Sequence, residues 1–368
     1  MISKYIFKNC FFTFLMVAAT VTTGRTVEPE RTVLPKADKK VIKAIVVYED
    51  PKLEDGRYLH QLFGWNNPRE LNRQYKDFFF EQSGGVVEYE IVNEIETDLF
   101  WTHYKQDPER KSWDLAEVVK LFSEPGWATL RKEERAESLS GDWPYKYKEM
   151  IEHYGFDKMR DRDEVHEIWV WSYPISGMYE SRFAGQGAFW LNSPPMNPNT
   201  TNEKLLIVMG FNYERDVACA VEDFGHRAES IMKEVYGRWN WRPSIPSAPN
   251  NWELYSAFDG VSNGSTHVGN VHFPPNGRKD YDWANPASVK SYHKEWQYYP
   301  NIRKNEDEGA KGEIMDCSAW GCNHLGWFKF WFSHFPNFQG INKKDGKLNN
   351  WWHYFVDYQE ARKLEKVQ

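Results

Sequence analysis

The sequence predicts an α/β or α+β fold with a mixed sheet, because short apolar runs alternate with helical patterns over residues 41–236. The order is strand, helix, strand, helix, strand, strand and then one long helix. From residue 237 the chain is dense in Pro, Asn, Gly, Trp and Tyr and shows little periodicity. We therefore expect a single domain at 41–368, with a sheet and site-helix subdomain at 41–236 and a loop-rich subdomain at 237–368.

The predicted strands are runs of β-branched and aromatic residues. Residues 43–48 form a short run bounded by charge, which is typical of a buried strand. Residues 86–97 alternate apolar and polar side chains, which indicates a strand with one buried face. Residues 167–173 predict a strong strand, and 187–192 a short extended piece. An apolar run at 205–210 precedes the long helix.

The predicted helices are marked by caps and by periodicity. Asn67 followed by Pro68 is a helix start, and the periodic pattern stops at the Gly pair after residue 82, so the first helix covers 68–82. Further helical patterns cover 145–154, 213–236 and 324–334. The segment 213–236, which we call the site helix, is the longest of them.

The N-terminus has the pattern of a signal peptide. Lys4 and Lys8 precede an apolar run that begins at Cys10 and is shorter than the roughly 20 residues of a membrane span. We assign residues 1–25 to the signal peptide and 26–40 to a linker. The mature protein is then expected to be secreted, extracellular or periplasmic, with no stable membrane span. An uncleaved anchor is the alternative.

Composition limits the classes of partner. Lys and Arg number 46 against 53 Asp and Glu, a net charge of −7, which argues against nucleic-acid binding. Aromatic residues make up 17% of the chain and include 18 Trp, which either fill a core or stack on ligands such as sugars. Three cysteines follow the signal peptide, Cys219, Cys317 and Cys322, and they allow one disulfide whose pairing stays open. The sequence also leaves the oligomeric state open.

The site helix carries the candidate chemistry. Glu222, His226 and Glu229 recur at i, i+4 and i+7 and share one face. Glu222 and His226, one turn apart, can both reach one metal ion. Glu229 lies roughly 10 Å along the helix axis from Glu222, which favours Glu229 as a residue that supports the ligands rather than as a ligand. The competing interpretation is that His226 and Glu229 are the ligand pair. The alternative is an ion network in which Arg227, Glu222 and Glu229 neutralise one another.

This helix resembles that of metzincin-type zinc peptidases, which carry H-E-x-x-H, often H-E-F-G-H. Aligned on the Gly and the last His, Glu222 stands at the first zinc-binding His, Asp223 at the general-base Glu and His226 at the second His. The resemblance implies a mixed sheet with an antiparallel edge strand. Glu313-Ile314-Met315-Asp316-Cys317 is similar to the methionine turn beneath the metal in that clan. Segments such as GAFWLNSPP and GNVHFPPN also resemble a family of secreted microbial proteins, which implies no particular activity.

The resemblance implies zinc, but two of the family's ligand positions differ here. The first carries Glu222 in place of a His. The third ligand would fall at Met232, which cannot bind zinc in that role. The metal-binding residues would then be Glu222 and His226 with a ligand from elsewhere. The candidates for that ligand are Glu229, His267, His272 and His324. Asp223 would take a proton from water, and Arg227 or Tyr281 would stabilise the developing oxyanion.

A second candidate region follows the site helix. His272 lies between Asn270 and Pro274-Pro275 in a rigid polar loop, where it either binds a ligand or fixes the loop through a hydrogen bond. His267 is a weaker binding candidate. The cluster Asp280-Tyr281-Asp282-Trp283 contacts a sugar or forms a solvated turn, with Tyr281 and Trp283 as the binding candidates.

Three functions are compatible with these residues. The first is a secreted metal-dependent hydrolase, peptidase-like, acting on peptide or glycopeptide substrates. The second is a non-catalytic protein that binds glycans or another protein on an inactive peptidase scaffold. The third is a carbohydrate-active hydrolase, in which a site-helix carboxylate pairs with Asp280 or Asp282.

Overall fold

The computed structural model describes residues 31–102, 113–125, 145–196, 202–239, 246, 248–261 and 266–366. The chain divides into two units, Met1–Thr32 and Val33–Gln368, and the second holds every element described below. The expected signal peptide lies outside the described residues. Ala37 N donates to Asn337 O (2.8 Å) and Gln339 N donates to Pro35 O (2.9 Å), so residues 35–40, expected as linker, already pair with the fold.

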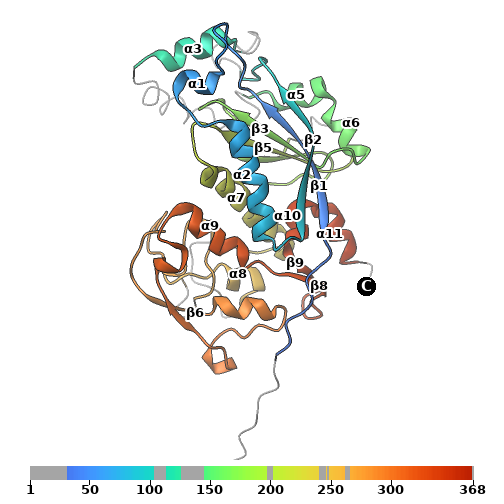
Figure 1. The fold of residues 1–368 in the computed structure, drawn as a ribbon. Helices are drawn as coiled ribbons and strands as arrows, with labels where there is room; N and C mark the ends of the chain where they lie inside the picture. The colour runs from blue at the N-terminus through green and yellow to red at the C-terminus, as the bar shows by residue number, and fades with distance from the viewer. Residues whose placement is uncertain are drawn as a thin grey trace, which may run out of the picture. The chain divides into compact units, whose positions relative to one another are not determined.

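A five-stranded mixed sheet forms the centre of this unit, in the order β2-β1-β3-β5-β4 (Figure 1). Its strands are β1 (Lys40–Tyr48), β2 (Val87–Glu96), β3 (Glu167–Ser172), β4 (Ser181–Ala184) and β5 (Leu206–Asn212). Strand β1 is parallel to β2 and β3, β3 is parallel to β5, and β4 is antiparallel to β5. The predicted fold class, a mixed sheet with an antiparallel edge strand and a long helix, is confirmed.

Helices and shorter pieces surround the sheet. The α-helices are α1 (Leu59–Phe63), α2 (Pro68–Gln82), α3 (Leu115–Ser123), α5 (Tyr147–Tyr154), α6 (Phe156–Asp161), α7 (Val217–Tyr236), α8 (Asn251–Tyr255), α9 (His324–Ser333), α10 (Trp351–Val356) and α11 (Tyr358–Leu364). The 3-10 helices are η1 (His293–Tyr298), η2 (Glu306–Glu308) and η3 (Cys317–Trp320). Two small antiparallel pairs join β6 (Val289–Ser291) to β7 (Glu313–Met315) and β8 (Asn337–Ile341) to β9 (Leu348–Asn350).

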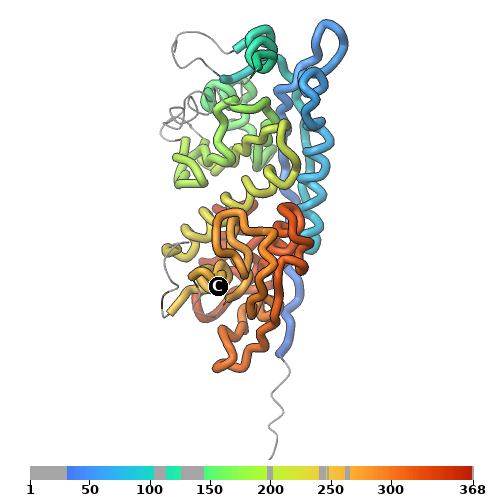
Figure 2. Tube along the Cα trace, turned by 90° about the vertical axis from the view of Figure 1, so that its left-hand side faces the viewer, coloured from blue at the N-terminus to red at the C-terminus, as the bar shows by residue number. Residues whose placement is uncertain are grey.

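Alternation along the strands builds a core on each face of the sheet. In β3, Trp169 and Trp171 belong to the larger core, which α2, α7, α9 and α10 complete, whereas Ile168 and Val170 belong to a smaller core with α5 and α6. Figure 2 shows α2 and α5–α6 on opposite sides of the sheet. A parallel strand buried on both faces needs apolar side chains along most of its length, which explains the apolar run at 168–171 between the buried Glu167 and Ser172.

Most Trp side chains of the loop-rich segment fill the larger core. Those fully buried beyond residue 237 are Trp252, Trp296, Trp327, Trp331, Trp351 and Trp352. The segment lacks periodicity because large aromatic rings, rather than long regular elements, bury its surface. Its two cysteines form the disulfide Cys317–Cys322, and Cys219 is unpaired.

Two predicted elements differ from the observed ones. Residues 187–192 are not a strand, because Gly187 (φ 79°) and Asn192 (φ 51°) adopt left-handed backbone that interrupts an extended chain. The edge strand is instead β4, just upstream. Helix α7 begins at Val217 rather than at Tyr213, whose N–H donates to Ser172 O (3.1 Å) and so continues the strand contact. No helix in the described ranges is long and apolar enough to cross a membrane.

Candidate metal centre

Helix α7 is fixed at its start by a side-chain cap and along its length by packing. Asp216 Oδ1 accepts hydrogen bonds from Ala218 N (3.1 Å) and Cys219 N (3.3 Å). The face that includes Phe224 and Ala228 is buried in the larger core. The opposite face, which carries Glu222 and His226, is consequently turned toward the loop-rich segment.

Three side chains converge on one point, and we call them the first ligand group: Glu222, His226 and His272. His272 Nε2 lies 3.1 Å from His226 Nε2 and 3.3 Å from Glu222 Oε1. His226 Nε2 lies 3.8 Å from the same Glu222 oxygen. Two atoms bound tetrahedrally to zinc at about 2.1 Å are roughly 3.4 Å apart, so this triangle has the size of a zinc ligand set.

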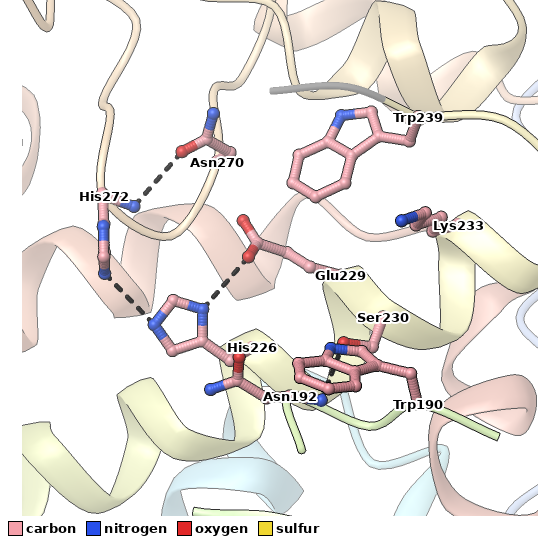
Figure 3. A pocket seen from close by; sticks show the side chains of 9 residues that line it. All are labelled: Trp190, Asn192, His226, Glu229, Ser230, Lys233, Trp239, Asn270 and His272. Atoms are coloured by element: carbon pink, nitrogen blue, oxygen red, sulfur yellow. Dashed lines mark hydrogen bonds and ion pairs between the residues drawn. The ribbon is translucent and has the colours of Figure 1, made fainter. Parts of the chain in front are cut away.

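The other imidazole nitrogens show why the three atoms face one another. His226 Nδ1 lies 3.1 Å from Glu229 Oε2 (Figure 3), and His272 Nδ1 lies 3.6 Å from Asp280 Oδ1. A carboxylate beside Nδ1 favours the proton on that nitrogen and leaves a lone pair on Nε2. Two lone pairs 3.1 Å apart repel, so a proton or a metal ion must lie between them.

His324 approaches Glu222 from the other side. Its Nε2 lies 3.0 Å from Glu222 Oε2, without the alignment of a hydrogen bond. The imidazole stacks on the indole of Trp283, with ring centroids 3.9 Å apart and planes 8° apart. Glu222 is therefore shared: one carboxylate oxygen faces His272 and the other faces His324.

These contacts shift the pKa values of the acid and the base. Burial alone would raise the pKa of Glu222, but its contacts with His226, His272 and His324 hold that pKa far below the ordinary value. Burial alone would lower the pKa of His226, but Glu222 and Glu229 raise it well above the ordinary value. The two shifts have opposite signs because imidazoles favour the ionised form of Glu222, whereas carboxylates favour the protonated form of His226.

Glu229 supports His226 rather than completing the ligand group. While Glu229 Oε2 faces His226 Nδ1, its Oε1 accepts a hydrogen bond from Val271 N (3.0 Å). Its carboxylate therefore points away from the convergence point and ties α7 to the loop that carries His272. The expectation of Glu229 as a metal ligand is corrected to that of a positioning residue.

Asp223 is a half-buried carboxyl beside the first ligand group. It makes no hydrogen bond or ion pair with any other residue in the described ranges. Burial raises its pKa well above the ordinary value, and the charges of Glu180 and Glu222 raise it further. A carboxyl group of this kind is free to exchange a proton with water or a ligand.

Glu180 is an acidic neighbour that sequence reasoning missed. It precedes β4, and its charge acts on Asp223, His226 and Tyr281. Asn192 donates a hydrogen bond to its carboxylate. No local spacing marks Glu180, because the pairing of β4 with β5 brings it to the site.

Arg227 is not an oxyanion stabiliser. Its side chain is fully buried and donates to both oxygens of Glu167, from Nη1 (2.8 Å) and Nη2 (2.5 Å). Its Nε donates to Phe355 O (3.0 Å). One residue past His226, the helix turns Arg227 into the core, so the alternative ion network among Arg227, Glu222 and Glu229 does not form either.

His267 also lies away from the first ligand group. It is fully buried, with Nε2 3.0 Å from Lys304 O, and its Nδ1 accepts from Trp296 Nε1 (3.3 Å). Burial lowers its pKa to about 4, so it is a neutral hydrogen-bonding residue of the core. The expectation of His267 as a binding residue is therefore wrong.

The predicted cluster at 280–283 divides into site and turn residues. The ring of Tyr281 packs on His272, with centroids 4.4 Å apart, and 51% of the residue is exposed. Burial, followed by the charge of Glu222, raises the pKa of Tyr281, which keeps its hydroxyl a donor. Asp282 accepts hydrogen bonds from Arg278 N (2.8 Å) and Asn285 Nδ2 (2.9 Å) and fixes the turn.

A cavity of about 470 Å³ opens beside the imidazoles. Its lining residues are Trp190, Asn192, His226, Glu229, Ser230, Lys233, Trp239, Asn270 and His272. Figure 3 shows Trp190, Trp239 and Lys233 grouped to one side of His226, with His272 on the other. Trp190 is 57% exposed, so an indole face is open to a ligand.

The segment that resembles a methionine turn forms β7 and the start of η3. Met315 belongs to the larger core. A comparison of the chain with protein-family models and with curated proteins finds no match.

Proposed function

We propose that this protein is a metal-dependent hydrolase, with zinc as the expected ion, that acts on peptide or glycopeptide substrates. The observation that carries the proposal is the convergence of His226 Nε2, His272 Nε2 and Glu222 Oε1 within 3.8 Å of one another. Nitrogen and carboxylate donors of this number suit a catalytic zinc, which keeps one position open. The antiparallel edge strand and the helix that follows β5 agree with what the metzincin resemblance implies.

The residues around the first ligand group can each serve a different step of hydrolysis. An ion bound there would polarise a carbonyl group and make water acidic, with a pKa of about 7. The positive charge of that ion would favour the ionised form of Asp223, which would then accept the proton of the attacking water and return it to the leaving amine. Tyr281, beside His272, would donate a hydrogen bond to the developing oxyanion. Glu229 would hold the imidazole of His226 in place.

The cavity favours a substrate that carries sugar. Trp190 and Trp239 offer indole faces, on which a sugar ring can stack through its C–H groups. Lys233 adds a positive charge, and Asn192 and Asn270 add amide groups for hydroxyl or carboxylate oxygens. These groups lie next to His226, where the scissile bond would be placed, which supports a glycopeptide over a bare apolar peptide.

The test is hydrolysis of a mixed peptide and glycopeptide library by zinc-loaded residues 26–368. We expect cleavage that a chelator abolishes, that His226→Ala removes, and that Asp223→Asn slows by roughly 10²–10⁴-fold. His153→Ala, at an exposed residue of α5, is the matched histidine control and should cleave normally. Glycan binding without turnover in every preparation would instead indicate a non-catalytic binding protein.

A further inference from the structure

The first turn of α7 and the start of α9 bring together a second set of ligand-type side chains, which we call the second ligand group: Asp216, Cys219 and His324. One donor atom from each lies within 4.8 Å of the other two. Atoms bound to one zinc ion at about 2.0–2.3 Å are roughly 3.3–3.8 Å apart, so small side-chain rotations close this set around an ion. None of the three is needed for the first ligand group.

We propose that Asp216, Cys219 and His324 form a second metal site, and that Glu222 bridges it to the first. Glu222 Oε1 lies 3.3 Å from His272 Nε2, whereas Glu222 Oε2 lies 3.0 Å from His324 Nε2. A carboxylate whose two oxygens face two different ligand sets is the usual bridge of a two-ion centre, in which the ions lie about 3.5–4 Å apart.

The donor atoms decide the kind of ion. A thiolate sulfur, an imidazole nitrogen and a carboxylate oxygen suit zinc or another borderline transition metal. Calcium and magnesium bind almost only oxygen ligands and would not select Cys219. The second site is thus specific for a thiophilic divalent ion.

The local structure holds these side chains in place. Asp216 caps α7 through Oδ1, which leaves Oδ2 for an ion, and Cys219 follows one turn later on the same helix. The Trp283 indole stacks on His324 and fixes the plane of the imidazole. His324 Nε2 lies 3.0 Å from Glu222 Oε2 without the alignment of a hydrogen bond, so this nitrogen is available as a ligand.

The test uses cobalt(II) as the probe, loaded into residues 26–368 without reductant, so that the disulfide Cys317–Cys322 stays closed. The proposal predicts two cobalt ions per chain by mass spectrometry and a thiolate-to-cobalt charge-transfer band. Cys219→Ala should remove the band and one ion. Asp216→Asn, which keeps a good helix cap, should weaken this ion and leave the other bound.

A second variant separates this proposal from the hydrolase. His226→Ala should lose one ion and keep the charge-transfer band, because the second ligand group is intact. If Cys219→Ala leaves both the metal content and the band unchanged, the second site is wrong even where the first binds metal. A single ion in the wild type, lost in both variants, would show one shared site and overturn the proposal. If His226→Ala leaves the metal content unchanged while Cys219→Ala removes one ion and the band, the hydrolase proposal fails and the second site is supported.

Discussion

At the residue scale, Glu229 is placed to support the proposed metal site without binding the ion itself. Its carboxylate lies against His226 Nδ1 and also accepts the amide of Val271. The first contact makes Nε2 a better donor, and the second sets the distance between α7 and the loop of His272. Such outer carboxylates are worth roughly 10–100-fold in metal affinity.

We therefore expect Glu229→Gln to weaken zinc binding roughly 10–100-fold while the fold is retained. The amide keeps an acceptor for Val271 N but loses the charge that polarises His226. Competition with a chromophoric chelator measures the affinity. Glu234→Gln, at an exposed residue of the same helix, is the control and should bind zinc like the wild type. Equal affinities for both variants would contradict the role of Glu229.

Arg227 contributes to the stability of the fold and not to the chemistry of the candidate site. It is paired with Glu167 inside the core, and removing one partner of a buried ion pair leaves the other charge unpaired. Arg227→Met should lower the free energy of unfolding by about 3–5 kcal/mol, measured by urea denaturation. Arg73→Met, at an exposed ion pair of α2, should change it by less than about 1 kcal/mol. A fully stable Arg227→Met protein would contradict the assignment.

At the scale of elements, Gly225 lets α7 approach the loop that carries His272. A Cβ at this position would lie 2.8 Å from Val271 Cγ2 and 3.4 Å from Trp331 Cζ3. The sequence hypothesis that Gly225 permits close backbone approach therefore has a physical basis. Contact with a β-branched residue cannot be relieved by a flexible chain end.

Gly225→Ala is expected to lower the free energy of unfolding by about 1–3 kcal/mol, against an intrinsic helical gain of up to about 1 kcal/mol. It should also weaken zinc binding, because His272 follows Val271 directly. Adding Val271→Ala removes the contacting methyl groups, so the double variant should recover part of the stability and part of the zinc affinity. The cycle is measured by urea denaturation and chelator competition, and strictly additive losses would rule out the contact.

The elements that the sequence predicts well are those with a local cause. Helix α2 has its capping Asn67, its Pro68 and its terminal Gly pair, and its observed bounds are the predicted ones. Strand β3 has an unbroken apolar run at 168–171. Strand β4 was missed because Ser181–Ala184 is short and polar at its start, and only its pairing with β5 makes it a strand.

The site was predictable only where its residues share a helix. Glu222, Asp223 and His226 follow from spacing on α7. His272 and His324 were candidates for the missing ligand, but nothing in the spacing could choose them over His267, because folding of the loop-rich segment brings them to Glu222. Arg227 was misassigned because its direction depends on where the core lies, which spacing alone does not give.

At the scale of the whole molecule, buried titratable groups set how stability depends on pH. Burial lowers the pKa of His267 from 6.5 to about 4. Between these values the unfolded chain binds the extra proton, so stability is lost as the pH falls from 6.5 toward 4. Glu49 acts in the opposite sense, because burial raises its pKa from 4.5 to about 7 and stability is lost as the pH rises through that window.

His267→Gln should flatten the acid loss of stability, and Glu49→Gln should flatten the loss on the alkaline side. The measurement is the free energy of unfolding in urea across both windows, with chelator present so that metal release does not contribute. Each variant is the control for the other, because their slopes have opposite signs. A His267→Gln protein with the slope of the wild type would contradict the burial of a neutral imidazole.

Metal binding by the first ligand group is the central proposal, and anomalous X-ray diffraction from crystals soaked in zinc tests it directly. It predicts a zinc peak within about 2.0–2.2 Å of His226 Nε2, His272 Nε2 and Glu222 Oε1. Well-ordered side chains at these positions with no anomalous peak between them would contradict it.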